Sequence, residues 1–270
     1  MSDLRIFSYL PNPRIWKATI AARLCGVEVE VRGSSPKELS SWLWDFDAHQ
    51  LSDKELESST DTRAGKVGFS GTLHKTSAFM EAHPFGTVPA AFSPDGKTGI
   101  FESNSIMRAV ARLGENRFPL YGRDAYEAAR VDSFLDASLV FARDSQIYLL
   151  SLMNGSVSPE IHARMRESFK VYLAGINQAL SPEREFLVGN GISIADICFV
   201  AELALFFNEK ARSGELVKKG FEPILHTGID AEFTRAFSHF GRLSKHPAFA
   251  PDVEPYLKKI ESHRPAEANR

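Results

Sequence analysis

Cysteine is scarce in this chain of 270 residues, and the two that occur, Cys25 and Cys198, lie far apart in the sequence. Neither belongs to a closely spaced pair or to a cluster of metal-binding residue types, so no pattern here is typical of a metal site or a disulfide scaffold. Both stand among apolar residues, and free cysteine is one of the most often buried residue types. We therefore expect two reduced core thiols, no bound metal and a cytoplasmic protein.

The chain also lacks an excess of charge of one sign. Its 32 Lys and Arg residues oppose 34 Asp and Glu residues, for a formal net charge of -2. This balance provides no strongly basic surface for nucleic acid. No apolar run approaches the roughly 20 residues that cross a bilayer, and the first residues contain no apolar signal core. We expect neither nucleic acid nor a membrane as a partner.

The N-terminal segment alternates between strand and helix patterns. Residues 4–9 are short and apolar, which favours a buried strand. Asn12 suits the cap of a following helix, Pro13 its first position and Gly26 its end. From Val27 the residues alternate with period two, so a second strand follows. A strand, a helix and a strand in so short a span predict a β-α-β unit with parallel strands.

The segment from Gly33 to Lys75 is less regular. Residues 36–46 are expected to form a short helix, and the polar, glycine-containing remainder is expected to be a long functional loop. Two alternatives exist for the aromatic residues of the helix: a wall for an aromatic substrate, or a packed apolar face. These residues are Trp42, Trp44 and Phe46.

Residues 76–113 predict a helix, two strands and a second helix. Thr76 or Ser77 suits the cap of a short helix that ends near His83, which is expected at a turn or at the surface. Asp95 and Gly96 suit the turn of a hairpin. Ser103 then suits the cap of a helix that runs to residue 113.

Strand patterns stop after Gly122, and apolar residues recur at helical spacing in the remainder of the chain. The segment 193–210 is apolar on nearly every side, so it is expected to be a buried central helix. Ser193 and Asp196 form a capping box at its start. The order of elements predicts an α/β domain over residues 1–115, with an insertion at about 33–75, and an all-α domain over residues 122–262.

Four motifs in this order resemble those of the cytosolic glutathione transferase superfamily. They read RIFSYLPNPRIWKATIAA, FGTVPAAF, FESNSIMRAVARL and FLVGNGISIADICFVAEL. The resemblance implies a thioredoxin-like N-terminal domain that holds glutathione, followed by a helical domain. It also implies a dimer, either of identical chains or with a related chain.

Two branches of this superfamily are similar to the chain. One is the transferase module of translation elongation factor 1B gamma, which implies a non-catalytic protein-interaction module. The other is the bacterial glutathione-dependent β-etherases, which implies that glutathione thiolate attacks an apolar or aromatic substrate and cleaves an aryl ether. We expect no further domain beyond Arg270, which argues against a full gamma subunit.

The resemblance also implies which residues hold glutathione. Val88 is expected to offer its main-chain groups to the cysteinyl part, before a cis Pro89, although an ordinary strand-initiating proline is the alternative. Glu102 and Ser103 are expected at the γ-glutamyl end, where Ser103 can cap the helix as well.

The glutathione thiol is expected at the start of the first helix, where a helix N-terminus lowers a thiol pKa. The candidate residues are Ser8, Tyr9 and Asn12, and Arg14 is expected to contact glutathione nearby. Ser8 and Tyr9 point to opposite faces of the strand, and Tyr9 can instead fill the core. Asn12 can donate to the thiolate or can merely cap the helix.

Overall fold

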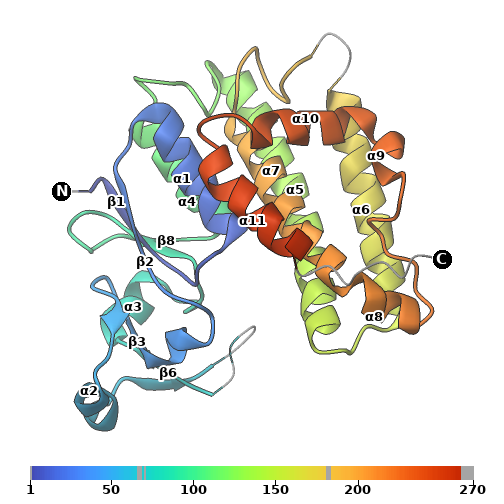
Figure 1. Cartoon of the computed structure of the whole chain (residues 1–270). Coiled ribbons are helices and arrows are strands. Elements are labelled where there is room, and N and C mark those ends of the chain that lie inside the picture. The colour runs from blue at the N-terminus through green and yellow to red at the C-terminus, as the bar shows by residue number, and fades with distance from the viewer. Residues whose placement is uncertain (1, 66–68, 70, 181–183, 263–270) are drawn as a thin grey trace. The chain divides into compact units, whose positions relative to one another are not determined.

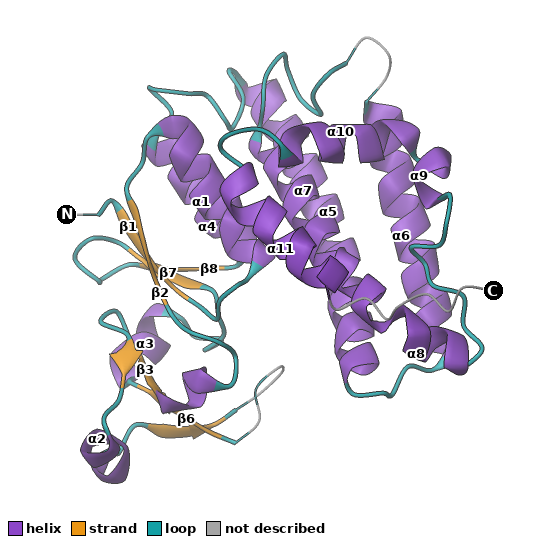
Figure 2. Ribbon diagram, viewed as in Figure 1, coloured by secondary structure: helices purple, strands orange, loops and turns teal. Residues whose placement is uncertain are grey.

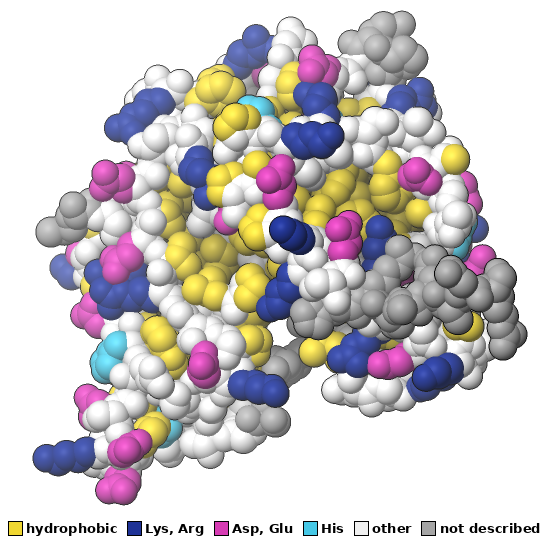
Figure 3. Space-filling view, viewed as in Figure 1, with side chains coloured by type: hydrophobic (Ala, Val, Ile, Leu, Met, Phe, Trp, Pro, Cys, Tyr) yellow, Lys and Arg dark blue, Asp and Glu magenta, His cyan; other side chains and the backbone are white. Residues whose placement is uncertain are grey.

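Figure 1 shows the computed structural model of the chain, which describes residues 2–65, 69, 71–180 and 184–262. The chain divides into two compact units, residues 1–119 and 120–270, which we describe separately. Lys and Arg side chains are interspersed with Asp and Glu side chains on the face drawn in Figure 3.

The first unit is built on a mixed four-stranded sheet (Figure 2). Its strand order is β2-β1-β7-β8, and the strands are β1 Leu4–Phe7, β2 Val29–Arg32, β7 Ala90–Phe92 and β8 Gly99–Phe101. Strands β1 and β2 are parallel and are joined through helix α1 (Pro13–Cys25). This confirms the predicted β-α-β unit. Strands β7 and β8 form the predicted antiparallel hairpin.

Helix α1 begins and ends where its sequence signals indicate. The Asn12 side chain caps it by accepting a hydrogen bond from the main-chain N–H of Arg14 at 3.0 Å. Gly26 ends it with a φ of 68°, in the left-handed region that glycine adopts most readily. Helix α4 (Ser103–Leu113) lies beside α1 on the same face of the sheet (Figure 2). Its capping position is Glu102 rather than the predicted Ser103, which is the first helical residue.

The segment 33–75 differs most from the sequence-based prediction, because it folds as a second sheet. The sheet has the order β4-β3-β6-β5, and β3 and β6 are parallel at its centre. Its strands are β3 Trp42–Trp44, β4 His49–Gln50, β5 Thr62–Ala64 and β6 Thr72–Lys75. A 3-10 helix (Glu38–Ser41) and helix α2 (Asp53–Ser58) complete the segment, of which residues 66–68 and 70 lie outside the described residues.

The predicted helix over residues 36–46 was therefore wrong beyond Ser41, and the predicted long loop was wrong as well. Aromatic side chains such as Trp42 and Trp44 favour strands. Trp44 pairs with Lys75 in the neighbouring strand, and a pairing so distant in the sequence leaves no local signal.

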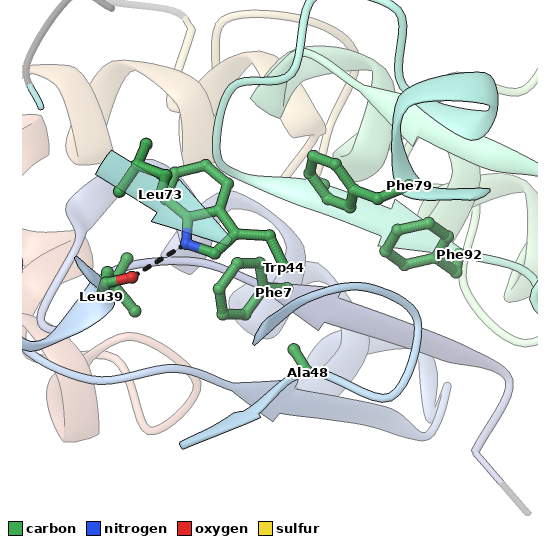
Figure 4. Close-up of a cluster of buried hydrophobic side chains, with 8 residues drawn as sticks. Phe7, Leu39, Trp44, Ala48, Leu73, Phe79 and Phe92 are labelled. Carbon is green, nitrogen blue, oxygen red and sulfur yellow. Dashed lines mark hydrogen bonds between the residues drawn. The ribbon is translucent and has the colours of Figure 1, made fainter. Parts of the chain in front are cut away.

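A buried aromatic cluster joins the two sheets (Figure 4). Trp44 lies at its centre, with 0% of its surface exposed, and its indole N–H donates to the Leu39 carbonyl at 3.0 Å. Phe7 of the first sheet packs edge-on against Trp44, with 5.4 Å between ring centroids. Trp44 is thus a core residue and not part of a substrate wall. Trp42 and Phe46 are partly buried against the same cluster.

The second unit is helical. Its long helices are α5 Ala125–Met153, α6 Pro159–Ala179, α7 Ile194–Phe206, α10 Thr234–Ser244 and α11 Ala250–Ser262. Shorter elements lie between α7 and α10, namely a 3-10 helix (Phe207–Arg212), α8 (Ser213–Lys218) and α9 (Ile229–Glu232). Helix α7 is buried along nearly its whole length, as predicted, although it ends at Phe206.

The predicted capping box at the start of α7 is present. Asp196 accepts hydrogen bonds from the main-chain N–H and the hydroxyl of Ser193, at 2.8 and 2.7 Å. Its other oxygen accepts from the Leu187 N–H, and His239 Nε2 lies 2.8 Å from the same oxygen. Asp196 therefore also joins α10 to the start of α7.

Candidate functional site

The strand register of the first sheet brings three of the predicted site segments to one edge. Phe7 lies opposite Ala90, and Ala90 lies opposite Phe101. Adjacent strands in a sheet are about 4.8 Å apart. The residues that follow β1, precede β7 and follow β8 therefore form one row, and these residues are Ser8, Pro89 and Glu102.

Val88 directly precedes Pro89, the middle residue of this row, and its main-chain N–H and C=O groups are available for pairing. The Val88–Pro89 peptide bond is cis, which confirms the sequence-based prediction. Among the described residues, neither the N–H nor the C=O of Val88 has a hydrogen-bond partner. Val88 is half-buried, so these groups form a short sheet edge at which an extended ligand can pair.

The turn before α4 has an unusual backbone. Glu102 has a φ of 65° and is the one non-glycine residue with positive φ in the described part of the chain. Such a conformation is costly for a residue with a side chain and is frequent at functional sites. It starts helix α4 at Ser103, whose main-chain N–H has no partner among the described residues. The positive end of the α4 dipole is therefore available to an anion.

Lys17 of α1 contacts the same turn. Its side chain is 1% exposed, and its ammonium donates to Ser103 Oγ at 3.3 Å and to Asn104 Oδ1 at 2.8 Å. Sequence reasoning missed this residue, and the one available signal was a lysine inside the apolar run IWKATIAA.

Lys75, at the end of β6, is a second buried cation beside the row. Its ammonium donates to the Gly86 carbonyl at 2.6 Å, two residues before Val88, and lies 4.5 Å from the centroid of the Trp44 ring. Sequence reasoning missed this residue also, because it treated residues up to Lys75 as a loop. The side chain of Lys75 reaches the segment that precedes Val88 because β6 is held in the second sheet, which was not predicted.

The structure brings Ser8 and Asn12 together. Ser8 is 0% and Asn12 1% exposed, and the Asn12 side-chain N–H donates to Ser8 Oγ at 3.1 Å. Tyr9 instead packs partly buried against the aromatic cluster, where its ring centroid lies 6.5 Å from that of Phe69. Arg14 is half-buried in the first turn of α1.

Both cysteines are free and buried, as predicted. Burial raises the pKa of the Cys25 thiol, so this side chain is a poor nucleophile. Within the described ranges, no group of three or more His, Cys, Asp or Glu side chains could hold a metal ion. No helix in the part of the chain that the structure describes is long and apolar enough to cross a membrane.

Comparison of the whole chain with solved structures shows which fold carries this row. A glutathione S-transferase from Methylobacterium radiotolerans, solved in complex with glutathione sulfonate, is similar with a TM-score of 0.62 and 18% identity, over 93% of this chain and 94% of that chain. The chain has the glutathione transferase fold. The thioredoxin-like domain and the helical domain predicted from the sequence are thereby confirmed.

Sequence comparison confirms the resemblance to both transferases and elongation factor subunits. Elongation factor 1-gamma 3 of Oryza sativa subsp. japonica is 27% identical over 199 residues, which cover 73% of this chain and 43% of that protein. Glutathione S-transferase F9 of Arabidopsis thaliana is 33% identical over 131 residues, 46% of this chain and 60% of that protein. The transferase-fold chain thus spans less than half the length of the elongation factor relative. No family model matches it.

Proposed function

We propose that the first unit binds glutathione along the row of Val88, Glu102 and Ser103. The observation that carries this proposal is the main chain of Val88, whose N–H and C=O have no hydrogen-bond partner among the described residues. The cysteinyl part of glutathione pairs with Val88 as an added strand would. The γ-glutamyl carboxylate accepts from the Ser103 hydroxyl and the first N–H groups of α4, and the Glu102 carboxylate pairs with the γ-glutamyl ammonium.

The glycine carboxylate of glutathione lies at the opposite end of this extended ligand. In our proposal Lys75 binds it, because the buried ammonium already lies on the Gly86 carbonyl, beside the segment that leads to Val88. A cation at one end and a helix N-terminus at the other match the two carboxylates of the tripeptide.

The reaction we propose is attack of the glutathione thiolate on an apolar, aromatic electrophile. An unperturbed thiol has a pKa of about 8.5, so the site must favour the thiolate at neutral pH. In our proposal the N-terminal turn of α1 supplies this stabilisation, with Asn12, Ser8 and Tyr9 as the contributing side chains and Arg14 beside them. Asn12 and Ser8 are buried. In our proposal they therefore favour the thiolate by holding the N-terminal turn of α1 in position, and not as side chains exposed to solvent.

The β-etherase form of this reaction is a substitution that balances without a further reagent. The thiolate sulfur forms a bond to the carbon beside a ketone, and the bond from that carbon to the aryl ether oxygen breaks. The electron pair leaves with the aryloxide, which takes a proton from water. The products are a thioether of glutathione and a phenol.

The proposal is tested by two measurements on the full chain. Isothermal titration calorimetry measures glutathione binding, and turnover is measured with a panel of aryl halides and β-aryl ether ketones. We expect saturable binding and glutathione-dependent loss of at least one electrophile class. Binding without any turnover would restrict the function to glutathione recognition, and absence of both in a folded protein would refute the proposal.

A second candidate function is a protein-interaction module of the elongation factor 1B gamma type. The observation that favours it is the similarity to elongation factor 1-gamma 3, which covers 73% of this chain. Under this alternative the fold binds partner proteins and performs no thiol chemistry. Co-purification with translation factors, combined with absence of turnover, would support it over the enzyme.

We further propose the arrangement expected for the enzyme. Residues 1–115, with the inserted sheet, form the glutathione-binding domain, and residues 122–262 form the domain for the substrate and for dimerisation. We propose a cytoplasmic protein that forms a homodimer or a heterodimer with a related chain. Light scattering of the purified chain tests the homodimer, since a monomer would favour the related partner.

A further inference from the structure

His83 lies between the two segments that we propose hold glutathione. It follows helix α3 (Ser77–Ala82) and opens a turn whose Gly86 N–H donates to its carbonyl, which confirms the turn position expected from the sequence, but it is 1% exposed and so does not lie at the surface. Its ring stacks on Phe101, with 5.0 Å between centroids and 9° between planes. Phe101 is the last residue of β8 and directly precedes Glu102.

The same ring contacts the segment before Val88. His83 Nε2 lies 3.2 Å from Thr87 Oγ1, and Thr87 directly precedes Val88. One side chain is thus stacked against the residue before Glu102 and hydrogen-bonded to the residue before Val88. The β7–β8 pairing brings the two proposed glutathione-binding segments together, and this ring adds a side-chain contact to each of them.

The other ring nitrogen of His83 indicates its protonation state. Nδ1 is buried and has no hydrogen-bond partner among the described residues. A buried N–H without an acceptor is costlier than an unused lone pair. The favoured form is therefore the neutral ring, with its proton on Nε2 donated to Thr87 Oγ1. Protonation would create an Nδ1–H group for which the described part of the chain offers no acceptor.

The charges around His83 oppose protonation as well. Burial lowers the pKa of His83, and the nearby Lys75 ammonium lowers it further, while a hydrogen bond with the Thr87 main chain works against both effects. Two carboxylates belong to the elements around the ring, Glu81 of α3 and Glu102 after β8. Both side chains are exposed to solvent, which screens their charges.

We propose that neutral His83 is a positioning residue of the glutathione site, which holds Thr87 and Phe101 so that the Val88 edge and the Glu102–Ser103 turn bind one ligand together. This inference rests on the proposed function. When His83 gains a proton, the Thr87 and Phe101 contacts rearrange, and Val88 and Glu102 shift from the positions in which they bind one ligand. Glutathione binding then requires that the proton be released.

The consequence is a specific dependence of glutathione affinity on pH. If binding releases one proton from His83, the dissociation constant rises as pH falls through the pKa of the free protein, by up to tenfold for each pH unit. Ionisation of the glutathione thiol in the site would add a pH dependence of its own, so the ligand for this test is S-methylglutathione, which has no thiol. Its carboxyls titrate near 4 or below, so a change in its affinity between about pH 5.5 and 7 is a property of the protein.

The experiment measures the affinity for S-methylglutathione by calorimetry across this window for wild type, H83F and H83Q. Phenylalanine keeps the stacking on Phe101 but cannot bond to Thr87, whereas glutamine can donate to Thr87 and cannot be protonated. The matched control is H74Q, since His74 is also buried but its Nδ1 lies 2.9 Å from Ser59 Oγ, in the inserted segment. Far-ultraviolet circular dichroism at each pH verifies that each variant is folded.

We expect the ligand affinities of wild type and H74Q to fall as the pH falls. The affinities of H83F and H83Q should stay constant over the same window. H83Q should bind within about threefold of wild type at pH 7 because it restores the bond to Thr87, while H83F should bind several-fold more weakly. A flat wild-type profile, or profiles for H83F and H83Q that bend like the wild type, would overturn the inference alone. Absence of glutathione binding by wild type at pH 7 would overturn the proposed function together with it.

Discussion

The ammonium of Lys17 donates to the amide oxygen of Asn104 at 2.8 Å, and both side chains are buried. This bond joins the second turn of α1 to the first turn of α4. It therefore fixes the distance between the helix start where we expect the glutathione thiol and the helix start where we expect the γ-glutamyl carboxylate.

Replacement of Lys17 with methionine should weaken both stability and binding. K17M keeps the apolar stem of the side chain but leaves the Asn104 oxygen without its charged donor, which should cost about 1.5–3 kcal/mol of unfolding free energy. Urea denaturation measures this loss, with K97M as the control because the Lys97 side chain is exposed. Equal stabilities of K17M and K97M would contradict a structural role for the bond.

Removal of the Ser103 hydroxyl should weaken binding of glutathione but not of cysteinylglycine. S103A removes one donor to the γ-glutamyl carboxylate, and a hydrogen bond to a charged group contributes about 1.5–3 kcal/mol, roughly a 10- to 100-fold change in affinity. Cysteinylglycine lacks the γ-glutamyl group, so its affinity should not change. The control is S105A, in the same turn of α4. Equal losses for both ligands would place the γ-glutamyl group elsewhere.

Two substitutions can separate the two roles of Asn12, as the cap of α1 and as a hydrogen-bond donor. N12A removes the cap of α1 and should cost about 0.5–2 kcal/mol of stability. N12D keeps an acceptor for the Arg14 N–H but loses the donor to Ser8 and adds a negative charge near the start of α1. If this turn stabilises the thiolate, N12D should raise the pKa of bound glutathione, measured by the ultraviolet absorbance of the thiolate. An unchanged thiol pKa in N12D would exclude Asn12 from thiol activation.

The elements that sequence reasoning could predict are those with local signals. Asn12, Pro13 and Gly26 mark the ends of α1 within a few residues, and Ser193 with Asp196 marks the start of α7. These signals act through hydrogen bonds between neighbours in the sequence, so a single sequence contains them. The cis bond before Pro89 was predicted from a resemblance and not from a local signal.

The inserted sheet could not be predicted, because its strands are two to four residues long and are held by distant partners. Lys75, Lys17 and His83 were missed for a related reason. A charged or polar residue in an apolar segment has no direction until the neighbouring element is placed, and each of these side chains reaches a different element from its own. The parts of the site that depend on tertiary packing were therefore the parts that the sequence did not reveal.

The buried carboxyl of Glu209 in the helical unit gives a prediction for stability against pH. Glu209 accepts from the Tyr148 hydroxyl at 2.6 Å and from the N–H groups of Ile224 and Leu225 at 3.0 and 2.7 Å. Burial raises its pKa, although these hydrogen bonds oppose the shift. Because the folded chain holds this proton more tightly than the unfolded chain, the stability linked to it is complete below the ordinary pKa of about 4.3 and is lost as pH rises through the folded pKa.

The variant E209Q cannot titrate at this position, so the difference in stability between wild type and E209Q isolates the contribution of the Glu209 carboxyl. Glutamine keeps an acceptor for two of the three donors, but its NH₂ group faces the third, so E209Q should be less stable than wild type in acid. The stability advantage of wild type over E209Q should shrink as pH rises from about 4 to 8, since only wild type must bury a charge. Chemical denaturation at each pH measures this difference. An advantage that grows with pH would mean that the hydrogen bonds to the carboxylate outweigh its burial.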